Sequence, residues 1–376
     1  MKSVSHLIVL LFTLLLAPAV LAQFGPRVLT TVNPDRSITF RLEAPAATDV
    51  QVRMANGSRR PETTPLIKDA DGVWSASLGP LAPDLYEYQM IVDGVVVADP
   101  GNGLPKPERA ARTSLVLVPG NPLVDERDVP HGTIHEETLN STVAGATRPL
   151  LVYTPPGYAA TAKLPLLVLY HGAGDTTWSW VRQGRIAQNL DNAIAQGTVM
   201  PLVIVAAETY ALQTTDANLL ARDTQTAVDA ELFADILPFV EKHYGARTSN
   251  RCRAIAGLSM GGGQALFSAL RHPSAFSAVS LLSPAWIGEL PLPDTANAHY
   301  AFQRFEIVTG TADAFLYMQE DVDRKLTQAG IAHDYVKLSG GDHSMFVWRP
   351  ALRTFVEQLT RDYAAGKWCP KDTNGN

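Results

Sequence analysis

The chain has 376 residues, of which 46% are apolar and 18% are charged, so its composition is that of a globular protein and excludes general disorder. Its 31 Lys and Arg against 37 Asp and Glu give a net charge of −6 without a basic run, which argues against a nucleic-acid partner, because that binding depends on neutralising phosphates. The length fits two domains, and 27 Gly with 26 Pro favour a β-rich or α/β chain over a helical bundle.

Residues 1–22 have the pattern of a secretory signal peptide. Lys2 gives a positive start, the run Leu7–Leu16 is apolar except for Thr13, and small residues lead to a cleavage position after Ala22. The apolar run is too short to cross a membrane, and no later stretch approaches the roughly 18 apolar residues that a span needs. We therefore predict an exported protein, secreted or periplasmic, with no membrane span.

Residues 23–120 are predicted to form a small all-β sandwich of the immunoglobulin-like type. Apolar and polar residues alternate over several short stretches, which is the pattern of half-buried strands. Asp93-Gly94 predicts a tight hairpin, because both positions must accept a positive φ. About seven short strands between Pro and Gly turns fit such a sandwich. We expect strands at 38–42, 50–54, 86–92, 95–97 and 115–118, followed by a linker at 119–122.

From residue 130 onward, apolar runs alternate with longer amphipathic segments. Alternating strands and helices predict a mostly parallel sheet covered on both faces, whose ligands bind at the carboxyl ends of the strands. We therefore expect an α/β domain over residues 130–368. The expected strands are 150–153, 166–170, 202–206, 254–256, 278–282, 305–308 and 334–338, and the expected helices are 186–195, 227–243, 262–271, 317–329 and 352–363.

The sequence Gly257-Leu258-Ser259-Met260-Gly261 lies between a predicted strand and a predicted helix. A G-x-S-x-G turn in that context is the nucleophile elbow, which holds its serine in a strained, exposed position. The following helix directs its positive end at the oxyanion that forms during acyl transfer. The same five letters also occur in ordinary glycine-rich turns, but the strand before and the helix after favour Ser259 as a nucleophile.

A serine hydroxyl is a weak nucleophile at neutral pH and needs a base. In folds with this elbow the acid and the histidine follow the serine in chain order. His343 comes directly after the last predicted strand, where the base is expected. His171, at the end of an earlier strand, is expected to form structural hydrogen bonds.

The acid of the triad should follow the strand before the last one. Asp313 lies there and is predicted to hold the imidazole in the required tautomer. Asp321 and Asp323 compete in principle but fall on the next predicted helix. Asp342 is the immediate neighbour of His343, and neighbours on one turn rarely face each other.

The remaining parts of the site are predicted from small residues and tryptophans. Gly172 and Ala173 follow the strand 166–170, and we expect the backbone N–H groups of Ala173 and Met260 to bind the oxyanion, with Gly172 against the substrate. Trp286 and Trp178 are candidates for lining the substrate pocket, although aromatic residues more often belong to the core.

Two further predictions concern metals and disulfides. The chain has no H-E-x-x-H motif and no His/Cys cluster, so we predict no metal and no cofactor. Cys252 precedes the strand that carries Ser259, and Cys369 follows a helix that runs back from His343. Both thiols should therefore lie at the end of the sheet opposite the active site. An oxidising compartment would allow a disulfide between them, and two unpaired thiols are the alternative.

These motifs together resemble carbohydrate esterase family one, the feruloyl-esterase and enterochelin-esterase-like α/β-hydrolases. The resemblance implies an α/β-hydrolase fold with Ser259, Asp313 and His343 as the catalytic triad. The front domain resembles the early-set immunoglobulin-like module that precedes such esterases. The resembling segments are Tyr153-Thr154-Pro155-Pro156-Gly157-Tyr158, His171-Gly172-Ala173-Gly174, Leu190-Asp191-Asn192, Ala256 to Ala265, Gly310-Thr311-Ala312-Asp313, and Gly340-Gly341-Asp342-His343 with Val347-Trp348-Arg349.

The sequence thus predicts a secreted serine esterase. By resemblance, its substrates are feruloyl or acetyl esters carried by plant polysaccharide. A siderophore esterase, a sugar acyltransferase with the same triad, and a carbohydrate-binding protein without activity are the alternatives. None of the chemical motifs lies in the front domain, so we expect it to support the fold or position the substrate.

Overall fold

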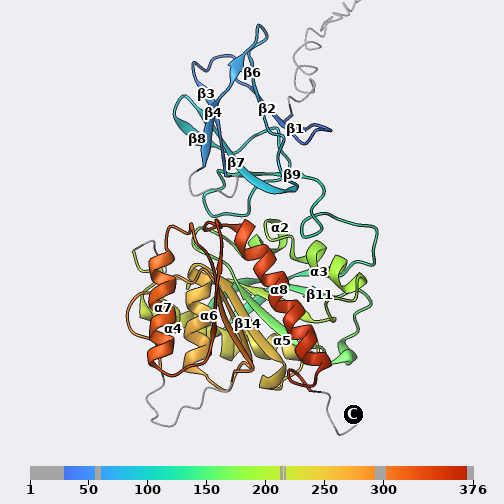
Figure 1. The fold of residues 1–376 in the computed structure, drawn as a ribbon, viewed down its shortest axis with the longest axis vertical. Helices are drawn as coiled ribbons and strands as arrows, with labels where there is room; N and C mark the ends of the chain where they lie inside the picture. The colour runs from blue at the N-terminus through green and yellow to red at the C-terminus, as the bar shows by residue number, and fades with distance from the viewer. Residues whose placement is uncertain (1–28, 56–60, 212–214, 216, 293–301, 371–376) are drawn as a thin grey trace, which may run out of the picture.

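A β-sandwich lies above a larger α/β domain in the computed structural model (Figure 1). The structure describes residues 29–55, 61–211, 215, 217–292 and 302–370. The predicted signal peptide, residues 1–22, lies outside the described residues. The fold class predicted from the sequence, an α/β-hydrolase domain preceded by an all-β immunoglobulin-like domain, is confirmed.

The front domain packs two antiparallel sheets, ordered β1-β2-β6-β5 and β4-β3-β7-β8 with β9 beside β7. Alternation places Ile38, Phe40 and Leu42 in the core, and Asp93 and Gly94 both have positive φ in the predicted hairpin. The polar or short strands β1, β4, β5 and β6 were not among the predicted ones. The strands are β1 (Thr31–Val32), β2 (Ile38–Glu43), β3 (Val50–Ala55), β4 (Glu62–Pro65), β5 (Ile67–Lys68), β6 (Val73–Leu78), β7 (Asp84–Val92), β8 (Val95–Val97) and β9 (Ser114–Val118).

The second domain contains an eight-stranded sheet of order β10-β11-β13-β12-β14-β15-β16-β17. The pairs from β13 to β17 are parallel, whereas β10 and β11 are antiparallel to their neighbours. The central strands are buried throughout, which explains their continuous apolar runs. The strands are β10 (Thr133–Ser141), β11 (Ala146–Thr154), β12 (Leu166–Tyr170), β13 (Val203–Ala207), β14 (Arg253–Leu258), β15 (Ala278–Leu282), β16 (Arg304–Gly310) and β17 (Asp334–Leu338).

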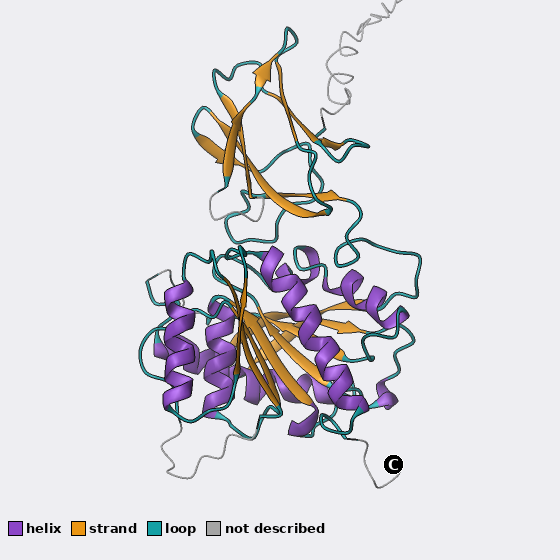
Figure 2. Cartoon of the chain, viewed as in Figure 1, coloured by secondary structure: helices purple, strands orange, loops and turns teal. Residues whose placement is uncertain are grey.

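Helices cover both faces of this sheet (Figure 2). Apolar residues of α4 to α7 pack on one face, and those of α2, α3 and α8 pack on the other. The helices are α2 (Ser179–Arg182), α3 (Ile186–Ala195), α4 (Arg222–Glu231), α5 (Leu237–His243), α6 (Met260–Arg271), α7 (Leu316–Gln328) and α8 (Met345–Ala364), with short 3₁₀ turns at Ala160–Ala162 and Asn250–Cys252.

Two predicted helices differ from the observed ones. The helix expected at 227–243 is divided by a π-helical segment, Leu232–Ile236, directly before α5. Pro238 at the start of α5 has no N–H to donate, so regular helical bonding is interrupted there. The helix expected from 352 begins at Met345, because the Ser344 hydroxyl caps it by accepting from the Phe346 N–H.

The sandwich lies over the carboxyl ends of the parallel strands (Figure 1). The Arg349 guanidinium of α8 is buried at this junction, with Nη1 2.6 Å from Asp84 Oδ1 on β7. Tyr86 of β7 also packs against Phe346 of α8, with ring centroids 5.3 Å apart. In folds of this class ligands bind at these strand ends, so the front domain borders the candidate site.

Candidate active site

Ser259 occupies the sharp turn between β14 and α6. Its backbone has φ 52° and ψ −119°, a conformation that costs a non-glycine residue energy and persists only where the surroundings enforce it. The surroundings are close: a Cβ at Gly257 would lie 2.2 Å from the Gly261 oxygen, and one at Gly261 would lie 2.4 Å from the His171 oxygen. The motif therefore needs glycine at both positions to bring β14, α6 and β12 together.

The side chains of Ser259, His343 and Asp313 form a chain of hydrogen bonds. His343 Nε2 lies 2.9 Å from Ser259 Oγ, and His343 Nδ1 lies 2.8 Å from Asp313 Oδ2. The Asp313 side chain is fully buried, while His343 keeps 19% of its side-chain surface exposed. The structure thus brings these three predicted residues together, in an arrangement that allows a base to take the serine proton while an acid holds the other ring nitrogen.

The Asp313 carboxylate is held in its charged form by its neighbours. Burial alone would raise its pKa, but the hydrogen bond and charge of His343, the Phe315 N–H at 2.8 Å and the Ser283 hydroxyl lower the pKa below its usual value. Trp348 Nε1 in turn donates to Ser283 Oγ at 3.0 Å. Asp313 is therefore an anion under the conditions in which imidazole is neutral.

Two aromatic rings enclose the imidazole of His343. Trp348 meets it edge to face with centroids 4.8 Å apart. Phe315 contacts it from another side at 5.0 Å, and 42% of Phe315 is exposed. Phe315 was not predicted from the sequence. An exposed aromatic ring that touches the base could contact a bound substrate.

Ser259 and His343 line a cavity of about 310 Å³ between the two domains. Ala173 and Gly172 line it beside Ser259, and Met260 is the first residue of α6, where backbone N–H groups lack helical partners. The front domain contributes one wall, including Lys106 and Glu87. The lining residues are Ala55, Pro61, Glu87, Lys106, Gly172, Ala173, Asp175, Gln183, Leu258, Ser259, Ala312, Ala314, Asp342, His343, Ser344 and Trp348.

Gly172 fits closely against the elbow. A Cβ at this position would lie 2.6 Å from Leu258 Cδ1 and 3.4 Å from Ser259 Cβ. His171 is buried and has both ring nitrogens near Thr209 Oγ1, at 3.1 Å each, with Nε2 also 3.2 Å from Glu208 Oε1. This is the structural hydrogen bonding expected for His171, and it anchors the strand end that carries Gly172.

The two tryptophans predicted to line the pocket lie elsewhere. Trp286 is 6% exposed and packs beside Phe267 of α6 in the core. The segment before it turns back at Ser283, and the Ala285 N–H donates to the Ser259 oxygen at 2.8 Å, which carries Trp286 past the pocket. Trp178 is half-buried, with the Arg182 guanidinium 4.7 Å from its ring centroid. Neither lines the cavity.

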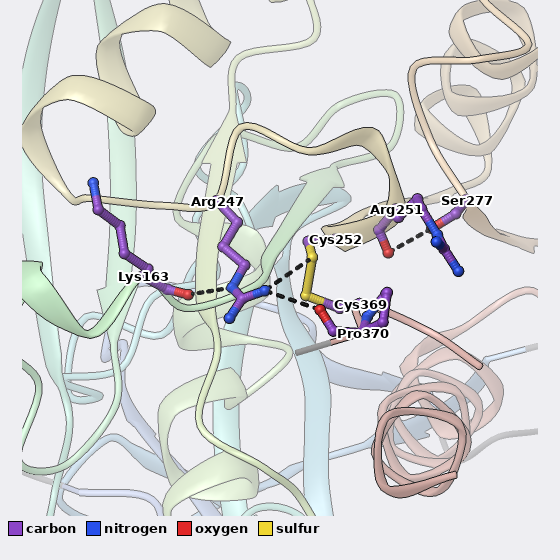
Figure 3. The surroundings of a disulfide bond; sticks show 7 residues. All are labelled: Lys163, Arg247, Arg251, Cys252, Ser277, Cys369 and Pro370. Atoms are coloured by element: carbon purple, nitrogen blue, oxygen red, sulfur yellow. Dashed lines mark hydrogen bonds between the residues drawn. A yellow bond between two sulfur atoms is a disulfide. The ribbon is translucent and has the colours of Figure 1, made fainter. Parts of the chain in front are cut away.

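Cys252 and Cys369 form a disulfide (Figure 3). Cys252 precedes β14 and Ser259 follows it, so the disulfide lies at the end of the sheet away from Ser259. Both residues are almost fully buried. The Cys369 N–H donates to the Arg251 oxygen at 2.9 Å, and Arg247 donates to the oxygens of Lys163 and Pro370 at 2.8 and 3.2 Å. The disulfide and these bonds tie the segment after α8 to the start of β14.

In the part of the chain that the structure describes, no group of three or more His, Cys, Asp or Glu is placed to hold a metal ion. Over the same residues, no helix combines the length and apolar character of a bilayer span.

Comparison with known families gives two matches that divide the chain. Residues 141–359 match the family described as "Putative esterase". Residues 23–101 match carbohydrate-binding module 48, the isoamylase N-terminal domain. The first match covers more than half of the chain and contains Ser259, Asp313 and His343.

Two curated relatives are similar in sequence. An endo-1,4-beta-xylanase/feruloyl esterase from Xylanibacter ruminicola is 30% identical over 338 residues, 87% of this chain and 45% of the relative. Endo-1,4-beta-xylanase Y from Acetivibrio thermocellus is 29% identical over 181 residues, 44% of this chain and 16% of the relative. The chain thus spans less than half the length of either.

Solved structures share the fold at lower identity. A ferulic acid esterase from Anaeromyces mucronatus matches with a TM-score of 0.57 and 21% identity, over 64% of this chain and 94% of its own. The enterochelin esterase from Shigella flexneri matches with a TM-score of 0.64 and 16% identity, over 86% of this chain and 92% of its own. The second match extends over most of the chain and shows that the two-domain arrangement occurs elsewhere.

Proposed function

We propose that this chain, which belongs to the esterase family of carboxylic ester hydrolases, is an exported serine esterase that cleaves feruloyl or acetyl esters of plant polysaccharide. The observation that carries the proposal is the hydrogen-bonded series Ser259–His343–Asp313 at a cavity open to solvent. The relative named as a xylanase/feruloyl esterase supports the substrate class. The signal-peptide pattern of residues 1–22 supports export.

In the proposed acylation step, Ser259 Oγ attacks the ester carbonyl while His343 Nε2 takes its proton. Asp313 keeps the imidazole in the tautomer that has a free Nε2 and stabilises the imidazolium. The carbonyl oxygen becomes an oxyanion that the backbone N–H groups of Ala173 and Met260 bind. When the tetrahedral intermediate collapses, His343 gives the proton to the departing alcohol, and the acyl group remains on Ser259.

Deacylation repeats these steps with water as the nucleophile. His343 takes a proton from the water, the hydroxide adds to the acyl carbon, and Ser259 Oγ leaves with the proton returned by His343. A sugar hydroxyl in place of water would give acyl transfer. Hydrolysis is the reaction proposed here, since the family match is to esterases.

The cavity supports an aromatic acyl group. The exposed Phe315 ring lies against His343, and Leu258, Ala312 and Ala314 provide apolar lining. Polar groups of the front-domain wall face the same cavity. An ester with an apolar acyl part and a hydroxyl-rich alcohol part matches this division.

The first test is the Ser259→Ala variant with an arylester as substrate. We expect an intact fold and a fall in kcat of about 10⁶-fold, because the attacking group is lost and only the oxyanion donors and binding remain. A folded variant that keeps more than about a tenth of the wild-type kcat would overturn the assignment of Ser259.

The second test is a panel of feruloyl, acetyl and siderophore-type esters, each with and without an added sugar alcohol. We expect the highest kcat/KM on feruloyl or acetyl esters and a free acid as the product. Preference for the siderophore ester, or transfer to the added alcohol, would replace the proposed substrate or reaction.

A further inference from the structure

A segment of the front domain, Lys106–Arg109, lies against the loop that carries Ala173. We name residues 172–179 the oxyanion loop and residues 106–109 the clamp segment. The Arg109 N–H donates to the Gly174 oxygen at 2.8 Å, and Glu108 pairs with Asp175 in an antiparallel bridge. Backbone pairing therefore joins the two domains within two residues of Ala173.

Side-chain hydroxyls of the oxyanion loop extend this contact. Thr176 Oγ1 and Ser179 Oγ each donate to the Pro107 oxygen at 3.1 Å. Ser179 is completely buried and is the first residue of α2. One carbonyl of the front domain thus holds both the middle and the end of the oxyanion loop.

Charges and an aromatic ring complete the contact. Lys106 Nζ lies 2.9 Å from Glu87 of β7 and 3.9 Å from Asp175 of the oxyanion loop, and all three side chains are mostly buried. The Arg109 guanidinium lies 4.4 Å from the ring centroid of Tyr210, whose hydroxyl accepts from the Gly174 N–H. A buried charge left without its partner is costly, so these pairs favour a single arrangement of the loop.

From these contacts we infer that the front domain positions the oxyanion loop for catalysis. The clamp segment holds the loop that carries Ala173, which lines the cavity with Ser259 and whose N–H is the proposed oxyanion donor. A backbone donor stabilises an oxyanion only where it is already in place, and a displacement of about 1 Å can lower a rate about 100-fold. Residues of the clamp segment are therefore positioning residues. This inference rests on the proposed function, since it assigns the loop a part in that reaction.

The test removes the two hydroxyls that bind Pro107 in the full chain. In a Thr176→Val/Ser179→Ala variant we expect kcat for a small soluble ester to fall about tenfold, with KM within about twofold of the wild type. Thr176→Val alone is a milder version, should the double variant fold poorly. Thr176→Ser keeps the hydroxyl and should retain the wild-type kcat.

The matched control removes side-chain hydrogen bonds between the α/β domain and the segment that links it to the front domain. Asn192 of α3 donates to the oxygens of Pro122 and Asp125, at 2.9 Å each, and does not line the cavity. Asn192→Ala should lower the melting temperature without lowering kcat at 25 °C. If the oxyanion-loop variants also lower only the melting temperature, the clamp is structural and the inference is wrong.

A second measurement separates this inference from the proposed substrate. A fluorophosphonate reacts when Ser259 Oγ bonds to phosphorus, fluoride leaves, and His343 takes the serine proton. This reaction needs the nucleophile and the oxyanion donors but no particular acyl group. We expect the labelling rate of Ser259 to fall about tenfold in the double variant and to stay unchanged in Asn192→Ala.

The outcomes are then distinct. A wild-type protein that is labelled at Ser259 but hydrolyses no ester of the panel contradicts the proposed function, while the labelling rates still decide the inference. Equal labelling rates in the double variant and the wild type overturn the inference alone. A wild-type protein that is not labelled at Ser259 overturns both.

Discussion

The Asp313 carboxylate is bound by His343, by the Phe315 N–H and by the Ser283 hydroxyl. Asn at this position keeps the shape of the side chain but offers an N–H to one of these partners. We expect Asp313→Asn to fold normally and to lower kcat about 10⁴-fold, because the imidazole is held in the tautomer that cannot accept the serine proton. Ester hydrolysis at saturating substrate measures this. A loss smaller than about tenfold would exclude Asp313 as the acid.

Glu306 is a buried carboxyl of β16 that takes no part in the proposed reaction. Burial raises its pKa from 4.5 to about 7, against the lowering effect of the Ser280 hydroxyl, which donates to it at 2.8 Å. Since the unfolded chain releases this proton at lower pH than the folded chain does, the free energy of unfolding should fall between pH 4.5 and about 7. The full loss is about 3 kcal/mol.

The Glu306→Gln variant removes this titration and keeps an oxygen acceptor for Ser280. We expect it to match the wild type near pH 4 and to be more stable by up to about 3 kcal/mol at pH 8. Urea unfolding at both pH values provides the measurement. A stability difference that is the same at pH 4 and pH 8 would contradict the prediction.

At the scale of elements, the close contact of α6 with β12 determines where Ser259 stands. A Cβ at Gly261 would lie 2.4 Å from the His171 oxygen and 2.7 Å from the Tyr170 carbonyl, so Gly261→Ala must push α6 away from the strand. We expect a loss of about 1–3 kcal/mol in the free energy of unfolding together with reduced activity. Gly103→Ala is a matched control, because a Cβ there meets nothing within 4 Å.

The helices and strands differ in how well the sequence predicted their bounds. The buried strands β12 and β15 were expected at their observed bounds, and so was the helix α3, because continuous apolar runs and helical periodicity are local signals. The more exposed strand β17 was also expected at its observed bounds. The edge strand β10 was not expected, since only two of its nine residues are buried and it carries few apolar residues. The start of α8 was placed too late because Pro350 lies inside the helix.

The order of motifs along the chain was enough to select Ser259, His343 and Asp313, because each follows a recognisable strand of a known topology. The residues that line the cavity could not be predicted from the order of motifs. Trp286 was expected at the pocket because it follows β15, but the turn at Ser283 directs it into the core. Lys106 belongs to another domain, and no local pattern reveals which residues two domains bring together.

At the scale of the whole molecule, the site and the disulfide lie at opposite ends of the parallel strands of the α/β domain. The carboxyl ends of the strands meet the front domain and enclose the cavity. The amino ends are closed by the disulfide between Cys252 and Cys369, which lie 117 residues apart in the sequence. The six residues of β14 separate these ends by about 20 Å. A change at the disulfide should therefore alter stability without altering the site.

The conformational entropy that the disulfide removes from the unfolded chain gives the expected loss of stability. Closing a loop of this length in the unfolded chain is worth about 4–5 kcal/mol, and its loss should lower the melting temperature by about 10 °C. Since both sulfurs are buried, a reductant reaches them poorly in the folded protein, and the Cys252→Ala/Cys369→Ala variant is the better probe. We expect unchanged kcat at 25 °C and a lower melting temperature.

Thiol titration of the denatured, unreduced protein provides the control for this last prediction. It should detect no free thiol in the wild type, whereas two free thiols per chain would rule out the disulfide. Because Cys369 follows α8, and α8 begins two residues after His343, loss of the bond could reach His343 by releasing that helix. A fall in kcat at temperatures where the variant is fully folded would show that the end of α8 helps to hold His343, and that the two ends of the domain are coupled.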